Sequence, residues 1–289
     1  MQVRVHPKVR LLILQGSLIA GVGIWLGVSG SVACKPPEST PPPPLPQSPW
    51  GGAYAYSYEL PEGFVRKEPG SVPVTVAVVN PSYKESESAL ANDLYLKVGK
   101  GLSASMGVDL DKILIAKGTT TTGPFPSLDE ITYSDKKGAA LTLAPRVFIT
   151  ADVKFTKLEN YHVYGTEREE HPFVMNVTGW ITFNMQEPMT GEKMWIKRLD
   201  LDPVKEEGMV AFKSVPEYSN GGGCGGPMLV AYHAGDIIYD GRTDALASAL
   251  KQIYPIVLSQ FQKFLDTDEM IQLKAKGAEI RKLKVYSGN

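Results

Sequence analysis

The sequence predicts one α+β domain with a mixed, mostly antiparallel sheet, an early strand–helix–strand unit and a C-terminal packing helix. Three patterns carry this prediction. Residues 72–79 are a β-branched run closed by an Asn-Pro-Ser turn at 80–82, which is typical of a buried strand. Apolar residues recur at helical spacing over 86–106 and 246–264, and they alternate over 177–185. Strand, helix and strand, then hairpins, then a helix is the order of an α+β domain.

The first helix is expected over about 86–106, with Ser86 or Ser88 as its N-cap. Its apolar positions recur every fourth residue, at Leu90, Leu94, Val98 and Leu102. We expect a second strand at Ile113–Ile115, a short helical turn at 128–138, and further strands at Leu141–Leu143 and Val147–Phe155.

Antiparallel hairpins are expected from Phe173 onward. Val177, Ile181 and Phe183 share one face of the first strand, and Trp180 lies on the other. A turn at 187–191, with proline early and glycine late, leads to a partner strand at Met194–Leu201.

A polar loop and a glycine cluster at 220–226 come next, followed by two short strands at Met228–Tyr232 and Asp236–Tyr239. The closing helix is expected to start at Thr243 as N-cap and to carry Pro255 in its interior.

The first 33 residues have the features of a secretory signal peptide. Three basic residues precede the uncharged stretch Leu11–Ala33, which ends in small residues before Cys34. A cysteine at this point suggests lipoprotein processing, in which Cys34 carries diacylglycerol and becomes the mature N-terminus. The stretch is also long enough to span a bilayer as an uncleaved anchor, so both forms of attachment remain open. In either case we expect the bulk of the chain to lie outside the cytoplasm, tied to a membrane.

Residues 34–70 are expected to form the lipidated cysteine and a proline-rich spacer. Eight prolines lie between positions 36 and 49, and each fixes φ and lacks an N–H. The folded domain is then expected over 71–265, with an exposed basic tail at 266–289.

Composition excludes several classes of protein. The chain has 289 residues, a formal charge of −1 and two cysteines. Two cysteines cannot form a disulfide-framework miniprotein or a four-cysteine zinc module. The near-zero charge offers no basic footprint for nucleic acid.

Several apparent motifs fail on their context. Gly99–Ala104 and Gly221–Gly226 match the G-x-G-x-x-G/A pattern, but neither opens a helix after a strand as a dinucleotide site requires. Cys224 and His233 lack a third orienting residue for nucleophilic catalysis. We therefore expect no catalytic residue, no cofactor and no enzymatic activity.

Charged residues near position 168 also match no site. Their acids and histidines do not have the spacing of metal ligands, so we expect a solvated charged loop and no metal. They are Glu167, Glu169, Glu170, His162 and His171. Arg146 and Arg168 are suited to binding a carboxylate, but they are also ordinary residues for a strand edge.

Several segments resemble the neuraminyllactose-binding hemagglutinin family of Gram-negative surface lipoproteins. Gly179-Trp180-Ile181, followed by Glu187-Pro188-Met189-Thr190-Gly191-Glu192 and Asp200-Leu201, looks like the family's most recognisable stretch. Asp244-Ala245-Leu246 looks like the start of its C-terminal helix, and Asn80-Pro81-Ser82-Tyr83 is a weaker match in the expected order. The resemblance covers about 72–265. It implies a lipoprotein of the outer membrane or flagellar sheath, with envelope proteins or sialylated glycans as its partners.

The family's proposed sialyllactose-binding segment should fall at about 154–160. Lys154 and Lys157 are its only basic residues here, and Glu159 follows them. An exposed lysine contributes about 0–1 kcal/mol to such a contact. We therefore expect a structural or interaction role in the envelope or flagellar sheath, with a sialic-acid-binding adhesin as the alternative.

Overall fold

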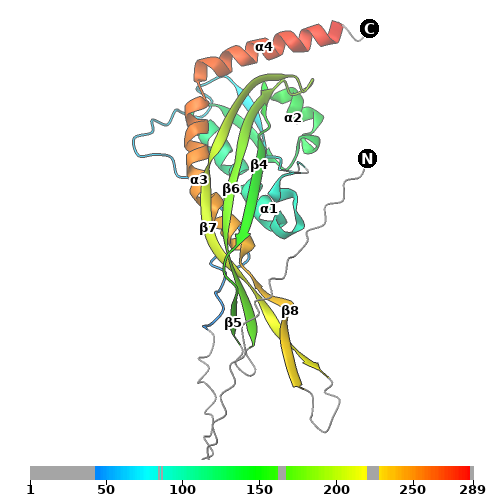
Figure 1. Ribbon diagram of the computed structural model, residues 1–289. Helices are drawn as coiled ribbons and strands as arrows, with labels where there is room; N and C mark the ends of the chain where they lie inside the picture. Colours follow the sequence, from blue (N-terminus) through cyan, green and yellow to red (C-terminus); the bar gives the residue numbers. More distant parts are fainter. Residues whose placement is uncertain (1–42, 84, 86, 162–166, 220–227, 287–289) are drawn as a thin grey trace, which may run out of the picture. The chain divides into compact units, whose positions relative to one another are not determined.

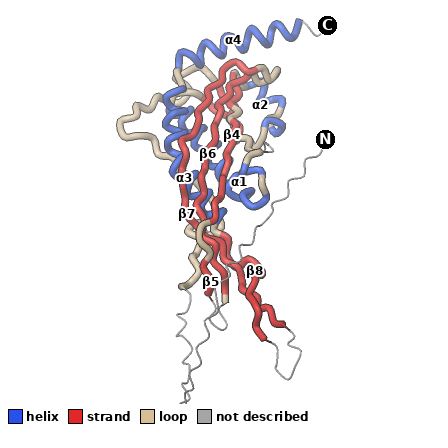
Figure 2. Tube along the Cα trace, in the orientation of Figure 1, coloured by secondary structure: helices blue, strands red, loops and turns tan. Residues whose placement is uncertain are grey.

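The mixed sheet predicted from the sequence is present in the computed structural model, and most of its strand pairs are antiparallel (Figures 1 and 2). The structure describes residues 43–83, 85, 87–161, 167–219 and 228–286. Cys34, Ser86, His162 and the glycine cluster with Cys224 lie outside these residues. These described residues belong to one compact unit.

Eight strands form the sheet within the described residues, in the order β2-β1-β3-β6-β7-β8, with β4 and β5 also pairing with β6. The strands are β1 (Thr75–Val79), β2 (Thr120–Phe125), β3 (Leu141–Leu143), β4 (Arg146–Phe155), β5 (Glu159–Tyr161), β6 (Arg168–Gln186), β7 (Lys193–Ser219) and β8 (Met228–Asp240). The helices are α1 (Leu96–Ala116), α2 (Tyr133–Gly138), α3 (Arg242–Phe264) and α4 (Thr267–Tyr286), with short 3₁₀ turns at Ala89–Ala91, Asp93–Tyr95 and Leu128–Glu130. Strands β1, β2 and β3 are parallel to one another, and the remaining pairs are antiparallel.

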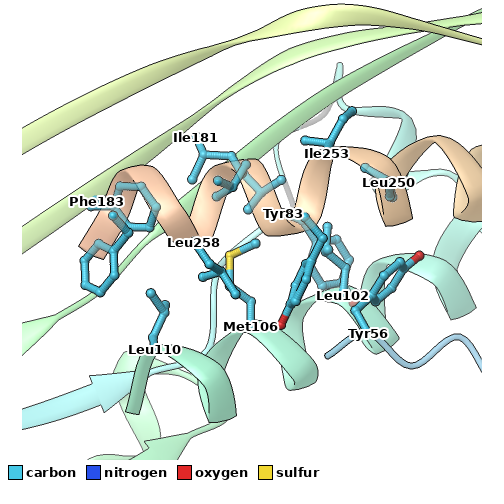
Figure 3. Close-up of a cluster of buried hydrophobic side chains, with 14 of the residues drawn as sticks. Tyr56, Tyr83, Leu102, Met106, Leu110, Ile181, Phe183, Leu250, Ile253 and Leu258 are labelled. Atoms are coloured by element: carbon cyan, nitrogen blue, oxygen red, sulfur yellow. The ribbon is translucent and has the colours of Figure 1, made fainter. Parts of the chain in front are cut away.

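The main core lies between the sheet and the helices α1 and α3. Val177, Ile181 and Phe183 of β6 are buried, as their alternation predicts. The ring of Phe183 lies 4.6 Å from that of Phe261 in α3, between ring centroids. Figure 3 shows side chains from β6, α1 and α3 meeting in this cluster. On the opposite face of β6, Trp180 stays half-buried and stacks on Phe148 of β4, with ring centroids 5.4 Å apart.

The first helix lies ten residues later than predicted. Ile113–Ile115, expected as a strand, is the last turn of α1, because Ile113 and Leu114 continue the buried stripe of the helix. A run of three apolar residues fits either structure, and here the helix buries it. Ser88 precedes the 3₁₀ turn at Ala89–Ala91, and its side chain makes no capping hydrogen bond there. Its hydroxyl bonds the backbone of Ile149, with Ile149 N donating to Oγ at 3.3 Å.

Strand β7 continues through the segment expected to be a polar loop. Residues 202–213 are polar along much of their length, yet from Val204 onward they pair with β6 as far as the Arg168–Lys213 pair. Backbone hydrogen bonds to β6 stabilise the strand there although one of its faces is exposed to solvent. Because the exposed face carries polar residues, the hydropathy pattern predicts a strand that is too short. The two short strands expected after it are one strand, β8.

Helix α3 starts one residue before the predicted cap. Gly241 occupies the N-cap position, and Asp240 accepts a hydrogen bond from Arg242 N at 3.1 Å through Oδ1. Thr243 lies inside the first turn and donates to the Leu94 carbonyl at 3.3 Å. Pro255 lies within the helix, as expected.

Ordered structure extends beyond both ends of the expected 71–265 span. Residues 50–60, here called the strap, lie against α1 and α3, and Tyr56 is part of the main core. Residues 267–286, expected to be an exposed tail, form α4, in which Met270, Leu273 and Ile280 are buried. None of the described helices is long and apolar enough to cross a membrane.

Candidate functional site

Lys154 and Lys157 lie at the exposed end of β4. The Lys154 side chain is 80% exposed, and its Nζ is 3.8 Å from Asp152 Oδ2 on the same strand. Lys157 is also exposed, just beyond the strand. An exposed strand end with a neighbouring carboxylate offers a sialic acid little beyond screened attraction.

Of the charged residues expected on a solvated loop, Glu169, Glu170 and His171 are strand residues of β6, so the expectation was wrong for these three. Glu167 lies just before the strand. Glu169 and Glu170 are buried because β5 and β7 pair with this end of β6 on either side. Arg168 is ion-paired with Glu170, and His171 Nε2 lies 3.5 Å from Glu169 Oε2. Among the described residues, no group of three or more potential ligands could hold a metal ion.

The glycines of the Gly99–Ala104 motif serve packing. A Cβ on Gly101 would lie 1.8 Å from the carbonyl oxygen of Tyr54, and one on Gly99 would lie 3.0 Å from the ring of Tyr83. The motif lies inside α1, as its sequence context predicted. These glycines therefore let the strap and the Tyr83 ring approach the helix.

A groove of about 520 Å³ opens at the carboxyl ends of the parallel strands. Its lining includes Val79 at the end of β1, Pro126 just after β2, and the short turn at Leu128–Glu130. In sheets with parallel strands, ligands bind outside the carboxyl ends, because the loops there can carry polar groups without disturbing the core. The Asn-Pro-Ser turn at 80–82 is the one sequence signal that marked this position.

The groove carries charges of both signs. Lys100 of α1 and Arg146 of β4 line it, together with Asp129 and Glu130. Arg146 Nη1 lies 3.8 Å from Glu85 Oε1, with both side chains partly exposed. Such a lining suits a polar segment with its own donors, acceptors and charges better than a single carboxylate. Sequence reasoning singled out Arg146 as a carboxylate binder but did not place it in a cavity.

A hydrogen-bond network supports the rim of this groove. Ser103 of α1 donates to the Pro81 carbonyl at 2.7 Å, and Asn80 N donates to the Phe125 carbonyl at 2.8 Å. The Asn80 side chain packs against Gly107, where a Cβ would lie 1.8 Å from its Oδ1. The turn after β1 is thus held to both α1 and β2.

Two further cavities lie beneath the terminal segments. One of about 580 Å³ lies between α2 and α4 and is lined by Lys274, Arg281 and Lys282. Lys274 Nζ donates to the Pro73 carbonyl at 2.5 Å, and Arg281 pairs with Glu187, so two of these cations already serve the fold. The other, of about 720 Å³, lies between the strap and α1.

A buried carboxylate secures the strap. Asp109 of α1 accepts hydrogen bonds at Oδ2 from Tyr58 N at 2.9 Å and from the Tyr254 hydroxyl at 2.8 Å. Burial, together with the bond to Asp109, raises the pKa of Tyr254, so its hydroxyl stays protonated and keeps donating. Burial and the nearby Asp244 carboxylate raise the pKa of Tyr54 to about 12.

A second buried carboxylate secures α4. Arg281 Nη2 lies 2.6 Å from Glu187 Oε1, and Thr190 N donates to Glu187 Oε2 at 2.5 Å. Burial acts to raise the pKa of Glu187, but the Arg281 guanidinium and the backbone donors of the turn outweigh it and lower the pKa. The Glu-Pro-Met-Thr-Gly turn is therefore a docking point for the C-terminal helix.

Comparison with known proteins gives distant structural likenesses. No family model matches the sequence, and no curated protein matches it. The fold is similar to that of a neuraminyllactose-binding hemagglutinin homolog from Helicobacter pylori, at 16% identity and a TM-score of 0.48, covering 78% of this chain and 99% of that one. It is also similar to a lipoprotein from Neisseria meningitidis, at 13% identity and a TM-score of 0.22, covering 47% of this chain and 84% of that one. Such values carry no conclusion about function.

Proposed function

We propose that this protein is an envelope lipoprotein, acylated at Cys34 and held at the outer membrane or flagellar sheath, whose domain binds a polar segment of another envelope protein. The role is binding without catalysis. The observation that carries the proposal is the groove at the carboxyl ends of β1 and β2, where charges of both signs line a cavity of about 520 Å³. A protein segment can pair with both signs at once.

The position of the two lysines argues against a sialic-acid site there. A lectin with a Kd of 1 μM needs about −8 kcal/mol, which small ligands normally gain in a concave site with several fixed donors. Exposed contacts such as Lys154 provides are worth about 0–1 kcal/mol each.

A photo-cross-linking amino acid in the groove tests the interaction. Placed at Leu128 of the full-length protein in its native membranes, it should capture a defined partner. The matched control is Tyr133, which is 69% exposed outside the groove and should capture none. Charge reversal by Arg146→Glu should remove the product, because the partner loses its ionic contact. Equal capture at both positions, or no effect of Arg146→Glu, would contradict a groove-specific partner.

The glycan alternative and the anchor have separate tests. Calorimetry of the intact protein in detergent should give no sialyllactose binding up to millimolar ligand. Micromolar binding that is lost in Lys154→Ala/Lys157→Ala would restore the adhesin. Mass spectrometry should find acyl chains on Cys34, and an intact residue 1–33 segment in the mature protein would refute acylation.

A further inference from the structure

The far ends of β7 and β8 form a two-stranded ribbon outside the main sheet. Beyond Lys213, which pairs with the first residue of β6, β7 pairs with β8 alone through Val215–Ser219. We call this part, with its partners in Met228–His233, the free ribbon. Figure 1 shows it leaving the helix-covered part of the sheet. Five residues of strand extend about 16 Å.

One face of the free ribbon is apolar and aromatic. Residues directly opposite each other in an antiparallel pair share a face. Pro216 therefore shares a face with Tyr232, and Tyr218, two positions further along β7, lies on the same face. The register shifts by one residue of β8 between Glu217 and Tyr218, so Tyr218 pairs with Leu229 and shares this face with it. Tyr218 is 57% exposed and Leu229 is 42% exposed, so the rest of the domain leaves this face largely uncovered.

The opposite face of the ribbon is more polar. Glu217 pairs with Ala231, and Val215 pairs with His233, so these four residues share the second face. Glu217 is the one carboxylate of Val215–Ser219, which contains no lysine or arginine. The free ribbon is thus amphipathic, with its charge directed away from the aromatic face.

The membrane tether leaves the domain beside the base of this ribbon. The Pro43 carbonyl accepts a hydrogen bond from the Arg168 guanidinium, and Arg168 is the β6 residue that pairs with Lys213. Eight residues lie between Cys34 and Pro43, and the nine Cα-to-Cα steps can span at most about 30 Å. Strand β6, by contrast, extends about 60 Å from Arg168 to Gln186. An acylated Cys34 therefore keeps the ribbon end of the domain, and not the α4 end, close to the lipid.

We propose that the aromatic face of the free ribbon lies on the lipid surface that holds Cys34, with Tyr218 and Leu229 at the depth of the headgroups. This inference rests on the acylation proposed above. Tyrosine favours the interface because its ring is apolar and its hydroxyl is polar. The outer backbone edges of a two-stranded ribbon keep unpaired polar groups, so the ribbon lies at the interface and does not enter the hydrocarbon. Glu217 faces water.

A lipid-quenching experiment on the full-length acylated protein tests this contact. In a Cys224→Ser background, Leu229→Cys carries an environment-sensitive dye, and the protein is reconstituted into phosphatidylethanolamine/phosphatidylglycerol vesicles. Spin-labelled lipid should lower its emission at least twofold. Two controls should change far less: Ala231→Cys on the polar face, and Leu283→Cys, which is on α4 and 71% exposed. Circular dichroism checks that each variant is folded.

The possible failures are distinguishable. Acylated, vesicle-bound protein with equal, weak quenching at Leu229→Cys and Leu283→Cys would overturn this inference alone. A different result would be a Leu229→Cys dye that is protected from aqueous iodide but not quenched by lipid. If this protection increases with the density of protein on the vesicles, the face contacts a second copy of the chain, and the inference is overturned. Protein that lacks acyl chains and does not float with vesicles would overturn both this inference and the proposed anchor.

Discussion

The strap and α4 both pack on the domain from outside the span predicted for it, and they are held by different interactions. In the strap, Tyr56 stacks on Tyr254 with centroids 5.4 Å apart, and Tyr58 N donates to the buried Asp109 carboxylate. Helix α4 buries a narrow apolar stripe and depends on the Arg281–Glu187 ion pair. The strap also bonds the Asp109 carboxylate, but its burial of aromatic surface does not depend on ionisation, whereas the ion pair of α4 requires an ionised carboxylate. The two ends should therefore detach under different conditions.

Truncation of the strap aromatic should have the largest effect. Tyr56→Ala removes a buried ring from the main core and should lower the free energy of unfolding by about 3–5 kcal/mol, measured by urea titration. The control is Tyr56→Phe. The Tyr56 hydroxyl is buried without a hydrogen-bond partner among the described residues, so its loss should cost little or stabilise the fold. A large loss in Tyr56→Phe would mean that the hydroxyl, and not ring burial, holds the strap.

Removal of the Asp109 carboxylate of α1, which holds the strap, should have the second-largest effect on stability. Asp109→Ala leaves the Tyr254 hydroxyl and the Tyr58 N–H without their acceptor. It should lower the free energy of unfolding, measured by urea titration, by about 2–4 kcal/mol. Lys112→Ala is the control. Lys112 also contacts Asp109, at 2.8 Å, but its side chain is 58% exposed. Its removal should therefore lower the free energy of unfolding by about 0.5 kcal/mol or less. Similar losses in both variants would assign the stabilisation to the ion pair.

Disruption of the α4 contact should be smaller and local. Glu187→Gln removes the charge that pairs with Arg281, whose side chain is 35% exposed, so we expect a cost of about 1–2 kcal/mol. Hydrogen exchange should accelerate in α4 and stay unchanged in α1. Lys282→Gln, which removes an exposed charge next to Arg281, should alter neither. Faster exchange throughout the domain would show that α4 unfolds only with the core.

The smallest expected effect is the pH dependence of α4. The folded-state pKa of Glu187 is lowered, so its contribution to stability is present above the ordinary glutamate pKa and is lost as pH falls through the folded value. Amide protection in α4 should therefore decline in acid below about pH 4. The decline should be weaker in Glu187→Gln. Equal acid sensitivity in that variant would assign the effect to other carboxylates.

The strands and helices with strong periodicity could be predicted from the sequence. The face shared by Val177, Ile181 and Phe183 is buried as expected, and β3 and the C-terminal helix α3 lie within a residue or two of their predicted ranges. Each pattern reports burial on one side of one element, which is a local property. Acylation of Cys34 and a role without sialic acid binding remain predictions.

The groove could be anticipated only through the turn at 80–82. Its walls come from Asn80, Lys100, Asp129 and Arg146, which meet because β1 and β2 are parallel and α1 connects them. No pattern in a short stretch of sequence predicts that these four residues line one groove. Similarly, Arg281 and Glu187 are separated by 94 positions, so no sequence window contains both.

The sequence by itself determined the α+β class, the order of its strong elements and which face of β6 is buried, because alternation and helical spacing arise from neighbouring residues. Tertiary structure decided where residues 50–60 and 267–286 pack, how far β7 runs, and which charges share a cavity. Those outcomes depend on long-range pairs such as Tyr58 with Asp109 and Arg168 with Lys213. Tertiary packing stabilises such contacts after the chain has folded back on itself, and local propensity does not report them.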